Sequence, residues 1–69
     1  MNAITYRLIN PDSTIGFKLM ELVAIDNGMF WFKCHYEVKF GSVIHHEADL
    51  ISFDEKELDV INQDYKIVP

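Results

Sequence analysis

The dipeptide Asn27-Gly28, set between two runs of alternating apolar residues, most constrains how this chain can fold. Both central positions of a type I′ β-turn need a positive φ angle, which Asn and Gly tolerate, and the twist of that turn matches paired strands. It therefore predicts a hairpin, and counting outward from the turn gives pairs from Ile25 with Phe30 to Ile15 with Phe40. The predicted core face consists of Ile15, Phe17, Leu19, Val23, Ile25, Phe30, Phe32, Tyr36, Val38 and Phe40.

A helix over residues 14–25 is the alternative, because Lys18-Leu19-Met20-Glu21-Leu22 contains good helix formers. We reject it, since a helix there would leave Phe30, Phe32 and Phe40 without a partner strand and would leave the Asn27-Gly28 turn unexplained.

Gly41-Ser42 predicts a second tight loop, of type II′, which returns the chain through residues 43–53. In the strict two-residue register, Cys34 pairs with Asp49 and Tyr36 with Glu47. A three-residue loop shifts the pairing by one and sets Ile44, His46, Ala48 and Leu50 against the apolar face. We favour the shifted register near the turn because it buries fewer charges, with a bulge that returns Ile51 and Phe53 to the core.

The remaining elements are an opening strand over residues 4–8, a helix within residues 52–61 and a closing strand over residues 65–68. Ser52 with Glu55 fits a helix capping box, and Asp54 is the alternative cap. The expected fold is a single mainly β domain over residues 1–69, of the β-rich α+β type. It is a coiled antiparallel meander or small open barrel with one short C-terminal helix before the closing strand. The element order resembles that of small SH3-like barrels, and this likeness transfers no function.

Composition narrows the functional classes. Eleven acidic and six basic side chains give 69 residues a net charge of −5, which argues against binding to a phosphate backbone. The single Cys34 cannot close an intramolecular disulfide, and no apolar run reaches the roughly 20 residues that span a bilayer. Residues 1–7 lack the basic and apolar regions of a signal peptide. We therefore expect a cytoplasmic setting.

A thiol and a carboxylate form the first candidate chemical site. The predicted hairpin sets Glu21 opposite Cys34, and the strict register adds His45, Glu47 and Asp49, a group that could bind a metal or activate the thiol. The alternative, which we favour, is a bulge near Glu21 that turns its carboxylate to solvent. Several unpaired buried acids would cost more than so small a domain can offset.

The histidines form the second candidate site. His35, Glu37 and His46 gather on one face in the strict register, whereas Cys34 with His35, and His45 with His46, point to opposite faces. We favour a solvated Glu37–His46 pair over a metal site. Ser13, Ser42 and Ser52 occupy turn or cap positions, and the three glycines are isolated. We expect no catalytic residues, no metal and no cofactor.

The face opposite the predicted core carries the residues most suited to binding a partner: Trp31, Met20, Leu22, Met29, Lys33 and His35, with Lys18 and Ala24 beside them. The helix, through Leu58 and Ile61, or closure of a barrel would cover this face; otherwise it marks a protein contact. We therefore expect a small acidic non-enzymatic protein-binding module of the regulator or inhibitor type, with a homodimer as one form. The alternatives are a nucleic-acid-binding barrel that uses Trp31, Lys33, His35 and Lys39, interrupted by Glu37, and a His/Glu metal-binding domain.

Overall fold

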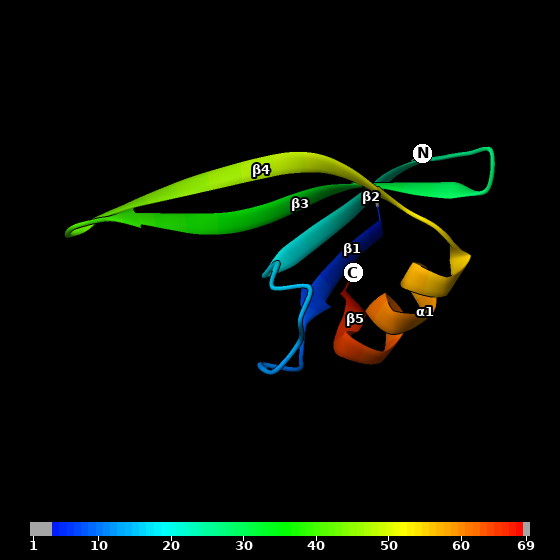
Figure 1. Cartoon of the computed structure of the whole chain (residues 1–69), viewed down its shortest axis with the longest axis horizontal. Helices are drawn as coiled ribbons and strands as arrows, with labels where there is room; N and C mark the ends of the chain where they lie inside the picture. Colours follow the sequence, from blue (N-terminus) through cyan, green and yellow to red (C-terminus); the bar gives the residue numbers. More distant parts are fainter. Residues whose placement is uncertain (1–3, 69) are drawn as a thin grey trace.

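The computed structural model describes residues 4–68 as an open five-stranded antiparallel sheet with one helix (Figure 1). The strand order is β4-β3-β2-β1-β5, so β4 and β5 form opposite edges and the sheet does not close into a barrel. The mainly β prediction is confirmed. Residues 1–3, on which the signal-peptide argument partly rests, lie outside this description. The elements are β1 Ile4–Leu8, β2 Leu19–Asp26, β3 Met29–Phe40, β4 Val43–Phe53, α1 Glu55–Asp64 and β5 Tyr65–Val68.

The first hairpin turns where the sequence predicts, with φ of 52° at Asn27 and 75° at Gly28. Ile25 pairs with Phe30 as expected, but a β-bulge between Leu22 and Ala24 then shifts the register by one residue. The bulge that we favour near Glu21 is thus confirmed, and the pairs of Val23 with Phe32 and of Glu21 with Cys34 in the simple ladder do not form. Beyond the bulge, Leu22 pairs with Phe32, Met20 with Cys34, Glu21 with Lys33 and Leu19 with His35.

Between Leu19 and Leu22, the bulge reverses which face of the sheet each side chain of β2 occupies relative to the predicted ladder, because a register shift of one residue turns every side chain to the other face. Met20 and Leu22 turn to the core side, while Leu19 and Glu21 turn to the other side. Val23, predicted to be buried, is 43% exposed.

The predicted hairpin is also too long at its open end, since β2 begins only at Leu19. The last backbone contact with β3 is the hydrogen bond from the Lys18 N–H to the His35 carbonyl (3.2 Å). Two residues before Lys18, Gly16 adopts a left-handed conformation with a φ of 77°, and the chain there no longer follows β3. The predicted pairs of Ile15 with Phe40 and of Phe17 with Val38 are wrong. Ile15 and Phe17 instead pack against the core from the loop.

The second hairpin keeps the strict register throughout, from Phe40 opposite Val43 to Phe30 opposite Phe53. The shifted register favoured from the sequence is wrong. Gly41 has a φ of 61°, which closes a two-residue loop. The acids of β4 need not be buried, because β4 is an edge strand and its residues 43–50 are all exposed.

The core lies between α1 and one face of the sheet, which we call the inner face. Asp54, the alternative cap, begins α1: its side chain accepts from the Glu57 N–H while the Glu57 carboxylate accepts from the Asp54 N–H. Ile61 is the fully buried residue of the helix, and Leu58 packs beside it. The buried cluster consists of Tyr6, Met20, Phe32, Cys34, Phe53, Ile61 and Tyr65.

Beyond the start of β2, the chain forms a two-stranded arm that projects from the sheet (Figure 1). Residues 36–40 of β3 pair only with residues 43–47 of β4. The arm accounts for the elongated shape, with extents of 41 × 24 × 22 Å. This β3–β4 arm carries none of the buried core residues.

Candidate functional site: the outer face and the free edge of β4

Trp31 lies on the sheet face opposite α1, which we call the outer face. Its neighbours across the sheet are Ala24 on β2 and Ser52 on β4, whereas Phe30 and Phe32 on either side of it turn inward. The indole is partly buried, and the helix packs on the other face. Of the two coverings considered from the sequence, neither the helix nor a closed barrel covers this face.

Two of the six predicted partner-binding residues do not lie on the outer face. Met20 is fully buried and Leu22 packs against the core, because the bulge turns both inward. Their assignment to an exposed binding surface is corrected. Four residues remain on the outer face: partly buried Met29, Trp31 and His35, and exposed Lys33.

The cationic groups of the outer face have carboxylate neighbours. His35 Nε2 lies 2.6 Å from Glu21 Oε1, and Lys18 Nζ donates to Glu37 Oε2 at 2.8 Å. The hydrogen bond from Lys18 holds the pKa of Glu37 below its ordinary value. Lys33 pairs across the sheet with Glu21. This alternation of charge does not provide the continuous positive groove that a nucleic-acid backbone requires.

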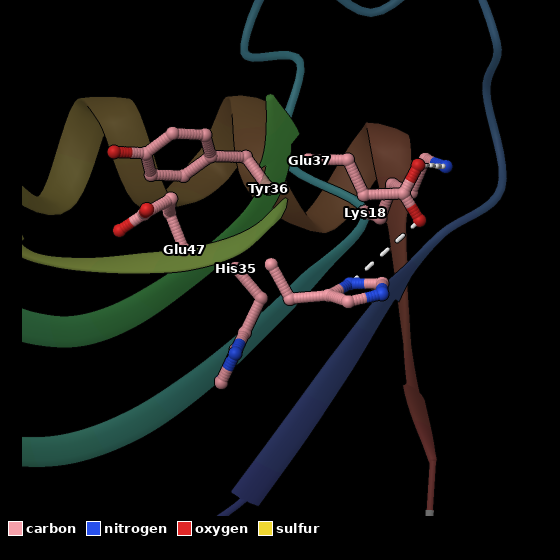
Figure 2. A pocket seen from close by; sticks show the side chains of 6 residues that line it. Lys18, His35, Tyr36, Glu37 and Glu47 are labelled. Carbon is pink, nitrogen blue, oxygen red and sulfur yellow. Dashed lines mark hydrogen bonds and ion pairs between the residues drawn. The ribbon is translucent and has the colours of Figure 1, made fainter. Parts of the chain in front are cut away.

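The candidate cluster of His35, Glu37 and His46 does gather on the outer face, where Glu37 pairs with His46. With Lys18, Tyr36 and Glu47 these residues line a pocket of ≈ 160 Å³ at the base of the arm. Figure 2 shows the side chains of His35 and Glu37 at this place. His46 Nδ1 is 3.9 Å from Glu37 Oε1, and His35 is turned toward Glu21 instead. Among residues 4–68, no group of three or more His, Cys, Asp or Glu side chains is placed to hold a metal ion.

Cys34 is buried, and its thiol faces the Phe32 carbonyl oxygen at 3.8 Å. Burial, with a smaller effect from Asp49, raises its pKa to about 11. The thiol is therefore protonated at neutral pH and lacks the thiolate that nucleophilic catalysis needs. Glu21 lies on the opposite face because of the bulge, so the separation of Glu21 from Cys34 that we favour from the sequence is observed and the candidate cluster does not form.

Exposed apolar side chains lie on the edge strand β4 and on the adjoining end of β3, with Ile44 and Leu50 on the outer face and Phe40 and Val43 on the inner face. The prediction that Phe40, Ile44 and Leu50 belong to the core is wrong. Phe40 is 64% exposed, Val43 54%, Ile44 51% and Leu50 62%. We call these four residues the edge patch. The signal that would have found them was already present, because the strict two-residue loop at Gly41-Ser42 sets Ile44 and Leu50 on the outer face.

Comparison of this chain with protein-family models, with curated proteins and with solved structures finds no match. The described helix has ten residues, and no helix within residues 4–68 is long and apolar enough to cross a membrane.

Proposed function

We propose that this protein is a small acidic non-enzymatic binding module that recognises another polypeptide through the edge patch and the outer strand β4. The observation that carries this proposal is a row of exposed apolar side chains along an unpaired edge strand, with Ile44 and Leu50 on its outer face and Phe40 and Val43 paired across its loop end on the inner face. Exposed apolar residues that cluster, rather than scatter singly, are typical of sites that contact other proteins.

The backbone of β4 supports the same proposal. This strand is eleven residues long and borders the sheet, so every second residue presents unpaired N–H and C=O groups. An extended segment from a partner can add to such an edge, with affinity from the backbone bonds and specificity from side-chain contacts. The other edge, β5, has four residues and offers a much shorter ladder.

The β3–β4 arm supplies the second line of support. A two-stranded ribbon without a third strand or a packed helix is only marginally stable in water. Contact with a partner would add the missing third strand along residues 43–47. Trp31 and Lys33, on the outer face beside β4, extend the surface toward the centre of the sheet. We propose that the module works as a regulator or inhibitor in a reducing, cytoplasmic setting.

The experiment compares capture by two immobilised double variants and by the unmodified protein. Baits are exposed to an extract of the source organism and, separately, to a differently tagged copy of the same chain. Phe40→Ser with Ile44→Ser removes apolar surface from the edge patch, and we expect it to lose the captured polypeptide. Ile25→Ser with Ile67→Ser is the matched control, because these residues are 62% and 56% exposed and lie outside the edge patch. Equal capture by both double variants would overturn the proposal.

A further inference from the structure

We propose that the polypeptide bound at β4 is a second copy of this chain, paired antiparallel through β4 across a two-fold axis at Glu47. This inference rests on the proposed function and names its partner. The two sheets would then join edge to edge into one continuous sheet, and residues 43–47 of each arm would lie beside residues 47–51 of the other copy, with the two arms pointing in opposite directions. A two-fold interface of this kind closes after two copies, unlike a contact between β4 and β5, which would continue into a filament.

The backbone of β4 sets which residues can take part. Phe40 and Val43 close a two-residue loop, and such a closing pair is hydrogen-bonded. Odd-numbered residues of β4 therefore direct their N–H and C=O groups toward β3, and even-numbered residues direct theirs toward the free edge. The groups available to a second copy are those of Ile44, His46, Ala48 and Leu50.

The alternation of side chains restricts the register. A two-fold axis perpendicular to the sheet keeps each face continuous, so paired residues must both be odd or both be even. Centring the axis on Glu47 sets Ile44 opposite Leu50 and Val43 opposite Ile51. It also sets His45 opposite Asp49, and symmetry forms each of these contacts twice. Apolar side chains thus meet apolar ones, and an imidazole meets a carboxylate.

The neighbouring registers are less favourable. Centring on Ala48 places Glu47 opposite Asp49 twice, which gives two contacts between like charges. Centring on His46 sets His45 opposite Glu47 twice, but it also places Val43 opposite Asp49 twice, so two carboxylates meet apolar side chains. It leaves Ile44 opposite Ala48, so the contacts of Ile44 with Leu50 and of Val43 with Ile51 are lost. The register centred on Glu47 has one unfavourable contact, between Glu47 and its own symmetry mate on the axis.

That contact provides a specific test, because removing the charge should strengthen the dimer. In the proposed register, Glu47 meets its mate at a position without edge hydrogen bonds, where opposed side chains come closest. We expect Glu47→Gln to lower the dissociation constant of the dimer roughly two- to fivefold. We expect Leu50→Lys to raise it about tenfold, because this change breaks the contact with Ile44 twice.

The measurement is sedimentation equilibrium of the full chain over a range of concentrations, with circular dichroism to check that each variant is folded. Ile25→Lys is the matched control for Leu50→Lys, because both residues are 62% exposed and Ile25 lies on β2. Its dissociation constant should equal that of the unmodified chain. Amide hydrogen exchange gives the register directly: Ile44, His46, Ala48 and Leu50 should become protected as the concentration rises.

A monomer at every concentration up to about 1 mM would overturn the dimer. A dimer that is unaffected by both Glu47→Gln and Leu50→Lys would overturn this interface. If the chain stays monomeric while capture from the extract still depends on the edge patch, the second copy is the wrong partner and the proposed function stands. If neither capture nor self-association depends on the edge patch, both proposals fail.

Discussion

At the scale of single residues, Trp31 and Phe32 are adjacent on β3 but belong to different environments. Phe32 is fully buried and packs edge-on against Tyr6 and Phe53, with ring centroids 5.3 and 5.7 Å away. Trp31 is partly buried on the outer face between Ala24 and Ser52. Orientation, rather than size, decides what each ring contributes to folding.

We predict that Phe32→Ala destabilises the protein by roughly 3–5 kcal/mol, since it opens a cavity in the centre of the core. Trp31→Ala should cost about 1 kcal/mol, because solvent can fill the space on the outer face. Urea denaturation of both variants measures the difference. If Trp31→Ala unfolds the protein as readily as Phe32→Ala, the indole is a core residue and the outer face is covered rather than open to solvent.

The residues also explain where sequence reasoning reached its limit. Asn27-Gly28 and Gly41-Ser42 fix their turns through backbone angles that few residues tolerate, and both turns lie where expected. Between Leu19 and Ile25, apolar side chains occupy odd and even positions alike, so alternation cannot choose a face. The bulge beside Val23 carries no Gly or Pro that would mark it, and only the position of Glu21 on the apolar face pointed to a bulge nearby. Met20 and Leu22 were therefore assigned to the wrong face.

At the scale of elements, the long loop before β2 is held in place by the end of the helix. The Asp64 carboxylate accepts from Asn10 Nδ2 at 2.9 Å and from Ser13 Oγ at 2.8 Å. Its backbone carbonyl accepts from the N–H groups of Ile9 and Asn10. An acidic residue at a helix C-terminus is unfavourable for the helix dipole, and here the contacts with the loop offset that cost.

We predict that Asp64→Ala lowers the free energy of unfolding by about 1–3 kcal/mol, because Asn10 and Ser13 lose their acceptor. Asp59→Ala is the matched control, since Asp59 is exposed on the same helix; its effect should stay within about 0.5 kcal/mol. Chemical denaturation of both variants and of the unmodified protein measures these changes in the free energy of unfolding. A stability loss of the same size in both would show that the carboxylate does not hold the loop.

The elements that sequence reasoning placed correctly are those with local signals. The capping residues around Asp54 mark the start of α1, and alternation marks the strands at both ends of the chain. The separation of β2 from the β3–β4 arm has no such local signal, because it depends on Phe17 leaving the ladder to pack against the core cluster and the Tyr36 ring. Tyr65 fixes that path by donating a hydrogen bond to the Phe17 carbonyl. This contact spans 48 positions of the chain, so no short window of sequence contains it.

At the scale of the whole molecule, two buried weak acids, the Cys34 thiol and the Tyr65 phenol, make the free energy of unfolding decrease at alkaline pH. Burial raises the pKa of Cys34 from 9.0 to about 11. Burial is also the largest cause of the rise in the pKa of Tyr65 from 10.0 to about 12. Both groups lose their protons at lower pH in the unfolded chain than in the folded one. The contribution of each is therefore fully present below its unfolded pKa and is lost as the pH rises from about 9 toward 12.

We predict that the urea midpoint falls steadily between pH 9 and pH 11, and that Cys34→Ala falls less steeply over the same range. The variant loses packing at every pH, so the comparison concerns its slope and not its absolute stability. Identical slopes for the two proteins would contradict the buried, protonated state of Cys34.

The pairing of Thr5 with Val68 has a consequence for how this fold can be rearranged. The two ends of the described chain lie on adjacent strands, at the edge of the sheet farthest from β4. A short linker could therefore join them without disturbing the core, and the chain could be opened instead at the Gly41-Ser42 loop. Such a circular permutant would keep every strand in its place, while its new ends would lie at the tip of the arm.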